Sequence, residues 1–267
     1  MRVAAGDIVL NYELEGSGTP LVLTHGLGDT LHFWDDVVPM LTAHHAVLRW
    51  DVRGFGLSDK PAGPYTPALL AADLVALLDT LGIADAHVAG LSMGGVIAQR
   101  LALDHPTRVR SLVLVSTSSE VGPRGAANWQ RLADTIEQRG FGSGARDASR
   151  AFSPAFGAAH PDIVAAAGAQ TANNDPAAYA AAARAMSDYN WTAELARLRV
   201  PVLILQGLAD QLTPPGGSVK MQRALPASRL LMVPDTGHSL SVEQPDLFTT
   251  AVLGFTAGVD GTIALRK

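Results

Sequence analysis

Residues 86–95, AHVAGLSMGG, are the stretch from which the fold of the chain can be worked out. The first four residues are apolar and predict a strand, and VIAQRLAL at 96–103 predicts a helix. Ser92 lies between the two, in a turn so tight that its neighbours must be small, as Gly90 and Gly94 are. The start of a helix also directs backbone N–H groups and the positive end of the helix dipole toward such a serine. We therefore predict that Ser92 is a nucleophile rather than an ordinary turn residue.

Other short runs rich in Val, Ile and Leu have the same form. They are PLVLTHG (20–26), AVLRWDVRG (46–54), SLVLVST (111–117), PVLILQGLAD (201–210) and RLLMVPDTGH (229–238). Near-continuous apolar runs are typical of strands that are buried on both faces. Helical patterns lie between them at 67–81, at 93–104 and at 243–256, and Gly82 ends the first of these. This alternation predicts an α/β fold with an open, mostly parallel sheet flanked by helices, preceded by an antiparallel hairpin at 2–16.

The alternation breaks between about Glu120 and Asn190, where the chain is rich in alanine, helical in pattern and punctuated by Gly and Pro. We predict a core formed by residues 1–118 and 192–267, with residues 119–191 inserted as a helical lid. Insertions at the carboxyl ends of parallel strands are where such folds bind their ligands.

The composition excludes several classes of function. A length of 267 residues with 48% hydrophobic side chains suits one large domain, and a net charge of −5 without a basic run argues against nucleic-acid binding. The absence of cysteine excludes disulfides, thiolate chemistry and Cys-ligated zinc, and the remaining histidines show no metal-ligand spacing. The N-terminal residues do not read as a signal peptide, and the apolar runs are too short to cross a bilayer. We expect a cytoplasmic protein that binds neither metal nor membrane and acts on a small molecule. The sequence leaves open whether it forms homo-oligomers.

A nucleophilic serine needs a base and an acid that orients the base. His238, in the loop VPDTGHSLSVEQP after the last predicted strand, is our candidate base. Asp210 follows the strand PVLIL and is our candidate acid, since the expected chain order is Ser, acid, His. Glu120, after an earlier strand, and Asp235, beside the histidine, are the alternative acids.

The oxyanion of an acyl-transfer transition state needs hydrogen-bond donors that are already in place. We predict that the amide of Met93, directly after the nucleophile, is one donor and that the amide of Leu27, in HGLGD after an early strand, is the other. His25 is expected to shape that loop rather than to transfer protons. The motif DVRGFGLSDKP (51–61) predicts a long turn tied together by its polar side chains, with Arg53 as an alternative substrate contact.

Five motifs together point to a known family: HGLGDTLHFWDDVVPML, DVRGFGLSDKPAGPYT, GLSMGG, LADQLTPP and GHSLSVEQPDLF. They resemble the α/β-hydrolase superfamily and, within it, the 3-oxoadipate enol-lactonase and carboxylesterase branch. The resemblance covers about residues 8–118 and 195–256 and is weaker in the lid. It implies that Ser92, Asp210 and His238 form a catalytic triad, that Leu27 and Met93 form the oxyanion hole, and that no cofactor is required.

The lid is expected to select the substrate, a small carboxylic ester or a lactone. Candidate substrate-binding residues are aromatic: Phe33, Trp34, Trp129, Tyr189 and Trp191. An enol-lactone also carries a carboxylate, for which Arg124, Arg131 and Arg184 are available.

Other functions remain open. Haloalkane dehalogenases and epoxide hydrolases place an aspartate at the position of Ser92, which argues against both. Cofactor-free perhydrolases share Ser-Met-Gly-Gly, so the same triad could carry out perhydrolysis, C–C bond hydrolysis or acyl transfer instead. A non-catalytic ligand-binding protein on the same scaffold is the alternative outside enzymes.

Overall fold

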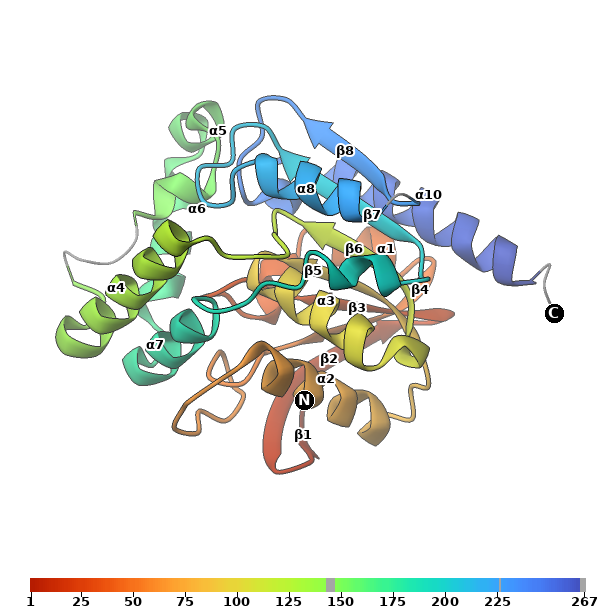
Figure 1. Ribbon diagram of the computed structural model, residues 1–267, viewed down its shortest axis with the longest axis horizontal. Coiled ribbons are helices and arrows are strands. Elements are labelled where there is room, and N and C mark those ends of the chain that lie inside the picture. The colour runs from red at the N-terminus through yellow and green to blue at the C-terminus, as the bar shows by residue number, and fades with distance from the viewer. Residues whose placement is uncertain (143–146, 226, 265–267) are drawn as a thin grey trace.

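The computed structural model describes residues 1–142, 147–225 and 227–264 and contains one central sheet (Figure 1). The strand order is β1-β2-β4-β3-β5-β6-β7-β8. The strands are β1 (Arg2–Ala5), β2 (Ile8–Gly16), β3 (Thr19–Thr24), β4 (His45–Trp50), β5 (Ala86–Leu91), β6 (Val109–Val115), β7 (Val202–Gly207) and β8 (Arg229–Val233). β2 pairs antiparallel with both β1 and β4, and the pairs from β4 to β8 are parallel. The predicted hairpin and mostly parallel sheet are confirmed.

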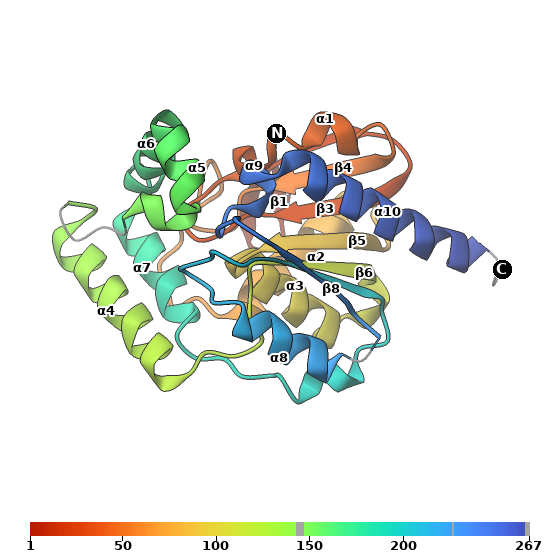
Figure 2. The same cartoon turned by 90° about the horizontal axis from the view of Figure 1, so that it is seen from above.

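Helices cover both faces of the sheet (Figure 2). One face carries α1 (Val38–Leu41), α9 (Leu240–Glu243) and α10 (Pro245–Ala264), and the other carries α2 (Pro67–Thr80), α3 (Met93–Asp104) and α8 (Gly216–Ala224). Successive strand residues serve opposite faces: Val88 of β5 packs into the cluster under α2 and α3, whereas Ala89 and Leu91 pack into the cluster under α10. Because both faces are buried, the central strands are apolar almost throughout.

The predicted helices are found with one change at the C-terminal side. α2 begins after Thr66, whose hydroxyl accepts a hydrogen bond from the Leu69 amide at 3.1 Å, and Gly82 follows with a φ of +68°. The helix predicted at 243–256 is found with other bounds, because Glu243 ends the short helix α9 and α10 runs from Pro245 to Ala264. Pro245 has no N–H to continue the preceding helix but suits the first turn of a new one.

The segment predicted as the lid follows β6 and precedes β7 in the chain, and it forms a separate group of helices beside the sheet (Figures 1 and 2). These helices are α4 (Pro123–Arg139), α5 (Pro154–Ala159), α6 (Pro161–Ala172) and α7 (Pro176–Ala185). The two ends of the segment pair with each other, since the amide of Val121 donates to Tyr189 at 3.0 Å and that of Trp191 donates to Ser119 at 3.1 Å. Residues 143–146 of the predicted lid and residues 226 and 265–267 of the predicted core lie outside the described residues.

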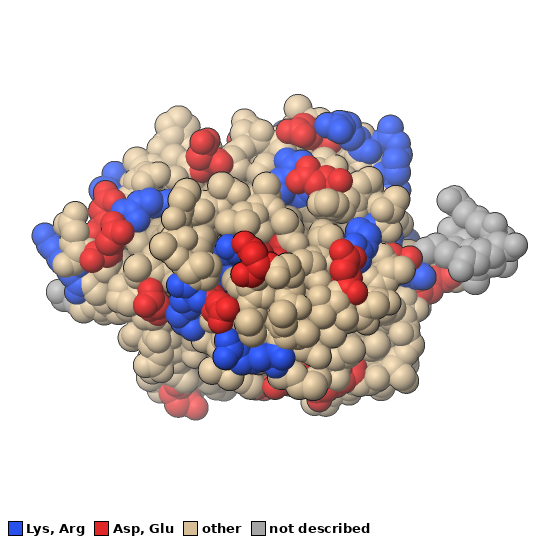
Figure 3. All heavy atoms as spheres, turned by 90° about the horizontal axis from the view of Figure 1, so that it is seen from below, with Lys and Arg blue, Asp and Glu red and all other residues tan. Residues whose placement is uncertain are grey.

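The surface in Figure 3 carries acidic and basic side chains beside one another rather than one extended area of a single charge. Some of these charges form ion pairs, such as Arg100 with Asp104 and Arg108 with Asp79. None of the helices in the described ranges combines the length and hydrophobicity that a bilayer-spanning helix requires.

Candidate active site

Ser92 occupies a strained turn between β5 and α3. Its φ of +53° and ψ of −114° are unusual for a residue with a side chain. A Cβ on Gly90 would lie 2.2 Å from the carbonyl oxygen of Gly94, and a Cβ on Gly94 would lie 2.2 Å from that of Thr24. Both positions therefore require glycine. The absence of a Cβ at these two positions lets the backbone pack tightly in this turn, which places Ser92 at the carboxyl end of β5.

His238 and Asp210 are hydrogen-bonded to each other. The distance from His238 Nδ1 to Asp210 Oδ2 is 2.8 Å, and both residues are buried. An Nδ1–H that donates to the carboxylate leaves Nε2 with a lone pair, which is the form of imidazole that can accept a proton. His238 and Ser92 line the same cavity.

Asp210 is held as a carboxylate by the loop after β7. Its oxygens accept hydrogen bonds from the amides of Leu212 and Thr213, each at 2.8 Å, and from Gln206 Nε2 at 3.1 Å. Burial acts to raise the pKa of Asp210, but His238 and the two amides outweigh it, so the pKa is lowered from its ordinary value. Neither alternative acid takes this place: Glu120 pairs with Lys220, and Asp235 is exposed.

The loop that carries His238 is also attached to the lid. The Ser239 amide donates to the Ala151 carbonyl at 2.8 Å. Glu243 Oε1 accepts from the amides of Gly237 and Ser153, at 2.9 and 3.0 Å. One carboxylate thus joins the loop of His238 to the lid segment before α5.

Leu27 and Met93, which the sequence proposes for the oxyanion hole, both lie near Ser92. Met93 begins α3 and Leu27 lies in the loop after β3. His25 shapes this loop, because its Nδ1 lies 2.7 Å from the Gly26 carbonyl and its Nε2 accepts from the Val52 amide at 3.0 Å. Burial lowers the pKa of His25, which favours the neutral ring that this pair of bonds requires.

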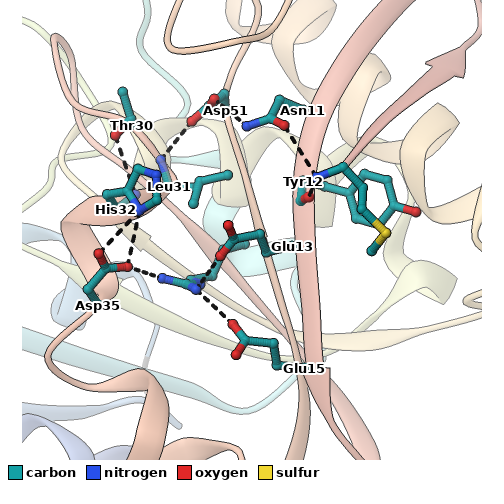
Figure 4. Close-up of polar contacts among 11 residues, drawn as sticks. Asn11, Tyr12, Glu13, Glu15, Thr30, Leu31, His32, Asp35 and Asp51 are labelled. Atoms are coloured by element: carbon teal, nitrogen blue, oxygen red, sulfur yellow. Dashed lines mark hydrogen bonds and ion pairs between the residues drawn. The ribbon is translucent and has the colours of Figure 1, made fainter.

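Asp51 fixes the far end of the same loop (Figure 4). Its Oδ1 accepts from the Leu31 amide at 2.7 Å, and its Oδ2 accepts from Asn11 Nδ2 and the Leu57 amide, each at 2.8 Å. The loop between β3 and Leu31 is therefore held at both ends. Arg53, from the same motif as Asp51, pairs with the buried Asp73 and lines neither of the cavities described below.

Two cavities meet at Ser92. The larger, which we call the base-side cavity, has a volume of about 440 Å³ and is lined by His238, by the loop after β3 and by α6. The smaller, the α8-side cavity, has a volume of about 330 Å³ and is lined by residues 117–122, by Trp129 of α4 and by the start of α8. Ser92 and Leu212 line both. A reacting group at Ser92 can thus extend one substituent into each cavity.

The structure divides the aromatic residues proposed from the sequence. Phe33 lines the base-side cavity, and Trp129 and Tyr189 line the α8-side cavity. Trp34 and Trp191 line neither. Trp34 packs against Phe248 in the core below α10, and Trp191 is buried with its Nε1 donating to Gln99 Oε1 at 3.1 Å.

The arginines considered for a substrate carboxylate also lie away from both cavities. Arg184 bonds to Asp134 and Glu137, and Arg131 bonds to Asn128. Arg124, at the start of α4, is exposed and lines neither cavity.

The sequence reasoning missed Asp29. Its side chain lines the base-side cavity, and desolvation raises its pKa to about 7, against the opposing charge of His238. The available signal was an acidic residue two positions after Leu27, in a loop expected to hold the oxyanion. Across the described residues, no group of three or more His, Asp or Glu side chains is arranged to bind a metal ion.

Comparison with known proteins assigns the chain to a family. The α/β hydrolase fold family matches residues 19–245. The chain is 31% identical over 253 residues to 3-oxoadipate enol-lactonase 2 of Acinetobacter baylyi, covering 94% of each sequence. It is 32% identical over 263 residues to a putative carbamate hydrolase, RutD, of Azorhizobium caulinodans, covering 96% of this chain and 97% of that one.

A solved structure agrees with these relatives. A thermophilic esterase from Thermogutta terrifontis, with malate bound, superposes with a TM-score of 0.91 at 30% identity, over 97% of this chain and 99% of that one. The strained serine turn, the parallel sheet and these relatives define the class of protein. The chain belongs to the α/β hydrolase fold family, and its relatives support a hydrolase activity.

Proposed function

We propose that the protein hydrolyses a small carboxylic ester or lactone through an acyl-enzyme on Ser92. The observation that carries the proposal is the 2.8 Å bond between Asp210 and His238, in the cavity that Ser92 also lines. The enol-lactonase and esterase among the similar proteins support an ester or lactone as substrate.

The reaction begins with proton transfer from Ser92 Oγ to His238 Nε2 while Oγ attacks the carbonyl carbon. The amides of Leu27 and Met93 donate hydrogen bonds to the oxyanion of the tetrahedral intermediate. The intermediate collapses, the C–O bond to the leaving group breaks, and the leaving oxygen takes the proton from His238. Water then attacks the acyl-enzyme with His238 again as base, which releases the acid and restores Ser92. Asp210 holds the imidazole in one tautomer and stabilises its protonated form.

Replacement of the nucleophile tests this proposal. Ser92→Ala is expected to lower kcat/KM for p-nitrophenyl butyrate by at least about 1,000-fold, because attack by a serine is lost. It should also abolish the mass increase that a fluorophosphonate probe gives on the wild-type protein. Ser228→Ala is the matched control, since Ser228 lines neither cavity. Ester turnover by Ser92→Ala at the wild-type rate would refute the proposal.

A carbamate is the second candidate substrate, on the strength of the RutD relative. A carbamate presents the same kind of carbonyl carbon to Ser92 but has nitrogen on one side of it. A panel of matched esters, lactones and carbamates separates the candidates by kcat/KM, and carbamate turnover above that of every ester would replace the first proposal. Peracid formation and C–C cleavage of a dienone acid are measured in the same panel.

A further inference from the structure

Asp29 lines the same cavity as Ser92 and His238, although the proposed mechanism does not use it. It lies two residues after Leu27, and its side chain lines the base-side cavity. A Cβ built on Gly26 would lie 3.2 Å from Asp29 Oδ2 and 3.6 Å from the Cβ of Ser92. The carboxyl group and Ser92 therefore flank the same glycine. A substrate with its carbonyl at Ser92 and a substituent in this cavity comes within reach of Asp29.

The fold leaves the Asp29 carboxyl group unsatisfied. Within the described ranges, no residue donates a hydrogen bond to it. Asp210, in the same site, accepts from Leu212, Thr213, Gln206 and His238. Asp29 is partly buried and lines the cavity, so its carboxyl group is free to interact with a ligand there.

The protonation state of Asp29 changes near neutral pH. Desolvation raises its pKa to about 7, and the charge of His238 opposes this rise. Asp29 is therefore a neutral hydrogen-bond donor below pH 7 and an anion above it.

The groups around Asp29 provide no fixed positive charge. His238 faces the cavity from the loop after β8, His32 and Asp36 face it from the segment after β3, and Asp147 faces it from the lid. No Lys or Arg is among the described residues that line this cavity. A substrate carboxylate in the cavity would therefore meet Asp29 without a neutralising arginine or lysine from the described walls.

We propose that Asp29 is a specificity-determining residue that favours uncharged substrates over substrates that carry a carboxylate. Ionised Asp29 repels a carboxylate in the base-side cavity, whereas protonated Asp29 can donate a hydrogen bond to it. The proposal rests on the proposed hydrolysis at Ser92 and names the substrate class. A 3-oxoadipate enol-lactone, which carries a free carboxylate, is on this basis a poor substrate above neutral pH.

The test compares matched neutral and anionic esters between pH 5.5 and 8.5. One pair places the carboxylate in the acyl group, with p-nitrophenyl valerate and mono-p-nitrophenyl glutarate. The other places it in the leaving group, with phenyl butyrate and 4-carboxyphenyl butyrate. Both members of a pair need the same triad, so the ratio of their kcat/KM values cancels any pH dependence of the catalytic step that they share. For at least one pair, the neutral-to-anionic ratio in the wild-type enzyme should rise about tenfold or more through a midpoint near pH 7.

Asp29→Asn removes the titration while it keeps a hydrogen-bond donor of the same size. In this variant the neutral-to-anionic ratio of kcat/KM should not change with pH, and it should equal the ratio that the wild type shows at low pH. Asp162→Asn is the charge-matched control, because Asp162 is an exposed residue of α6 that does not line the cavity. The control should retain the pH dependence of the wild type.

Three results would overturn the proposal: a flat ratio in the wild type for both pairs, an unchanged pH dependence in Asp29→Asn, or loss of the neutral substrate's turnover in a folded Asp29→Asn protein. Asp29→Ser repeats the test if the asparagine variant does not fold. All of these results differ from failure of the proposed function, in which Ser92→Ala would still turn over the neutral ester.

Discussion

The core and the lid contribute to the site in different ways. On the core side, Ser92 lies in a turn where a Cβ added to Gly90 or Gly94 would come within 2.2 Å of a carbonyl oxygen, and Asp210 is held by the amides of Leu212 and Thr213. On the lid side, α6 lines the base-side cavity but has no fully buried residue, and α4 has only Ala133 and Ile136. On this basis we propose that the core determines the chemistry and that the lid, together with the loop of Asp29, determines substrate selectivity.

The largest effect is expected from a substitution in the core part of the site. Asp210→Asn should lower kcat/KM by about 10,000-fold, because an amide in place of the carboxylate no longer favours the tautomer that leaves Nε2 free to accept a proton. Rates of ester hydrolysis at saturating and subsaturating substrate concentrations measure this loss of kcat/KM. Asp235→Asn, at an exposed residue of the same loop as His238, should stay within about twofold of the wild type. A comparable loss in both variants would mean that the acid has been misassigned.

The close packing of the serine turn is tested by adding one methyl group. Gly94→Ala should lower the free energy of unfolding by about 3 kcal/mol or more, because the new Cβ meets the Thr24 carbonyl oxygen. Urea unfolding gives the value. Gly254→Ala, in α10 with open space around it, makes the same substitution and should stabilise the protein by about 0.5–1 kcal/mol. If Gly94→Ala were as stable as the wild type, the core would be less constrained than the contrast requires.

Two lid tryptophans separate packing from selectivity. Trp191→Ala should cost about 3–5 kcal/mol of stability, because it empties a buried site and leaves Gln99 Oε1 unpaired. Trp129→Ala removes part of the wall of the α8-side cavity and should instead raise KM by about tenfold. Thermal unfolding and steady-state kinetics on both variants check the pair. A change mainly in KM for Trp191 and mainly in stability for Trp129 would reverse the assignment.

The smallest expected effect concerns the stability cost of Asp29. In the unfolded chain Asp29 releases its proton near its ordinary pKa, whereas the folded protein keeps it until about pH 7. The unfolded state thus binds fewer protons in between, so the free energy of unfolding falls as pH rises through this window. Asp29→Asn lacks this loss and should gain about 1–2 kcal/mol over the wild type between pH 5 and 8, given the partial exposure of the carboxyl group. Urea unfolding at both pH values measures the gain, and an equal difference at the two values would argue against the raised pKa.

Much of the fold could be predicted because its signals are local. The apolar runs predicted every parallel strand, and Gly90 and Gly94 predicted the serine turn, since both reflect what the backbone at those positions can tolerate. Pro245 was present in the sequence, but the break that it makes between α9 and α10 was not predicted. A helical period continues across a single-residue break, so the pattern alone does not reveal one.

The sequence by itself determined the strand–turn–helix around Ser92 and the choice of Asp210 and His238 as residues that follow strand ends. Only the tertiary structure decided which acid bonds to His238, that Trp129 lines a cavity while Trp191 is buried in the core, and that none of the described residues donates a hydrogen bond to Asp29. The physical reason is the range of the forces involved. Backbone geometry acts between neighbouring residues, whereas desolvation, cavity shape and the pairing of charges depend on segments brought together from distant parts of the chain.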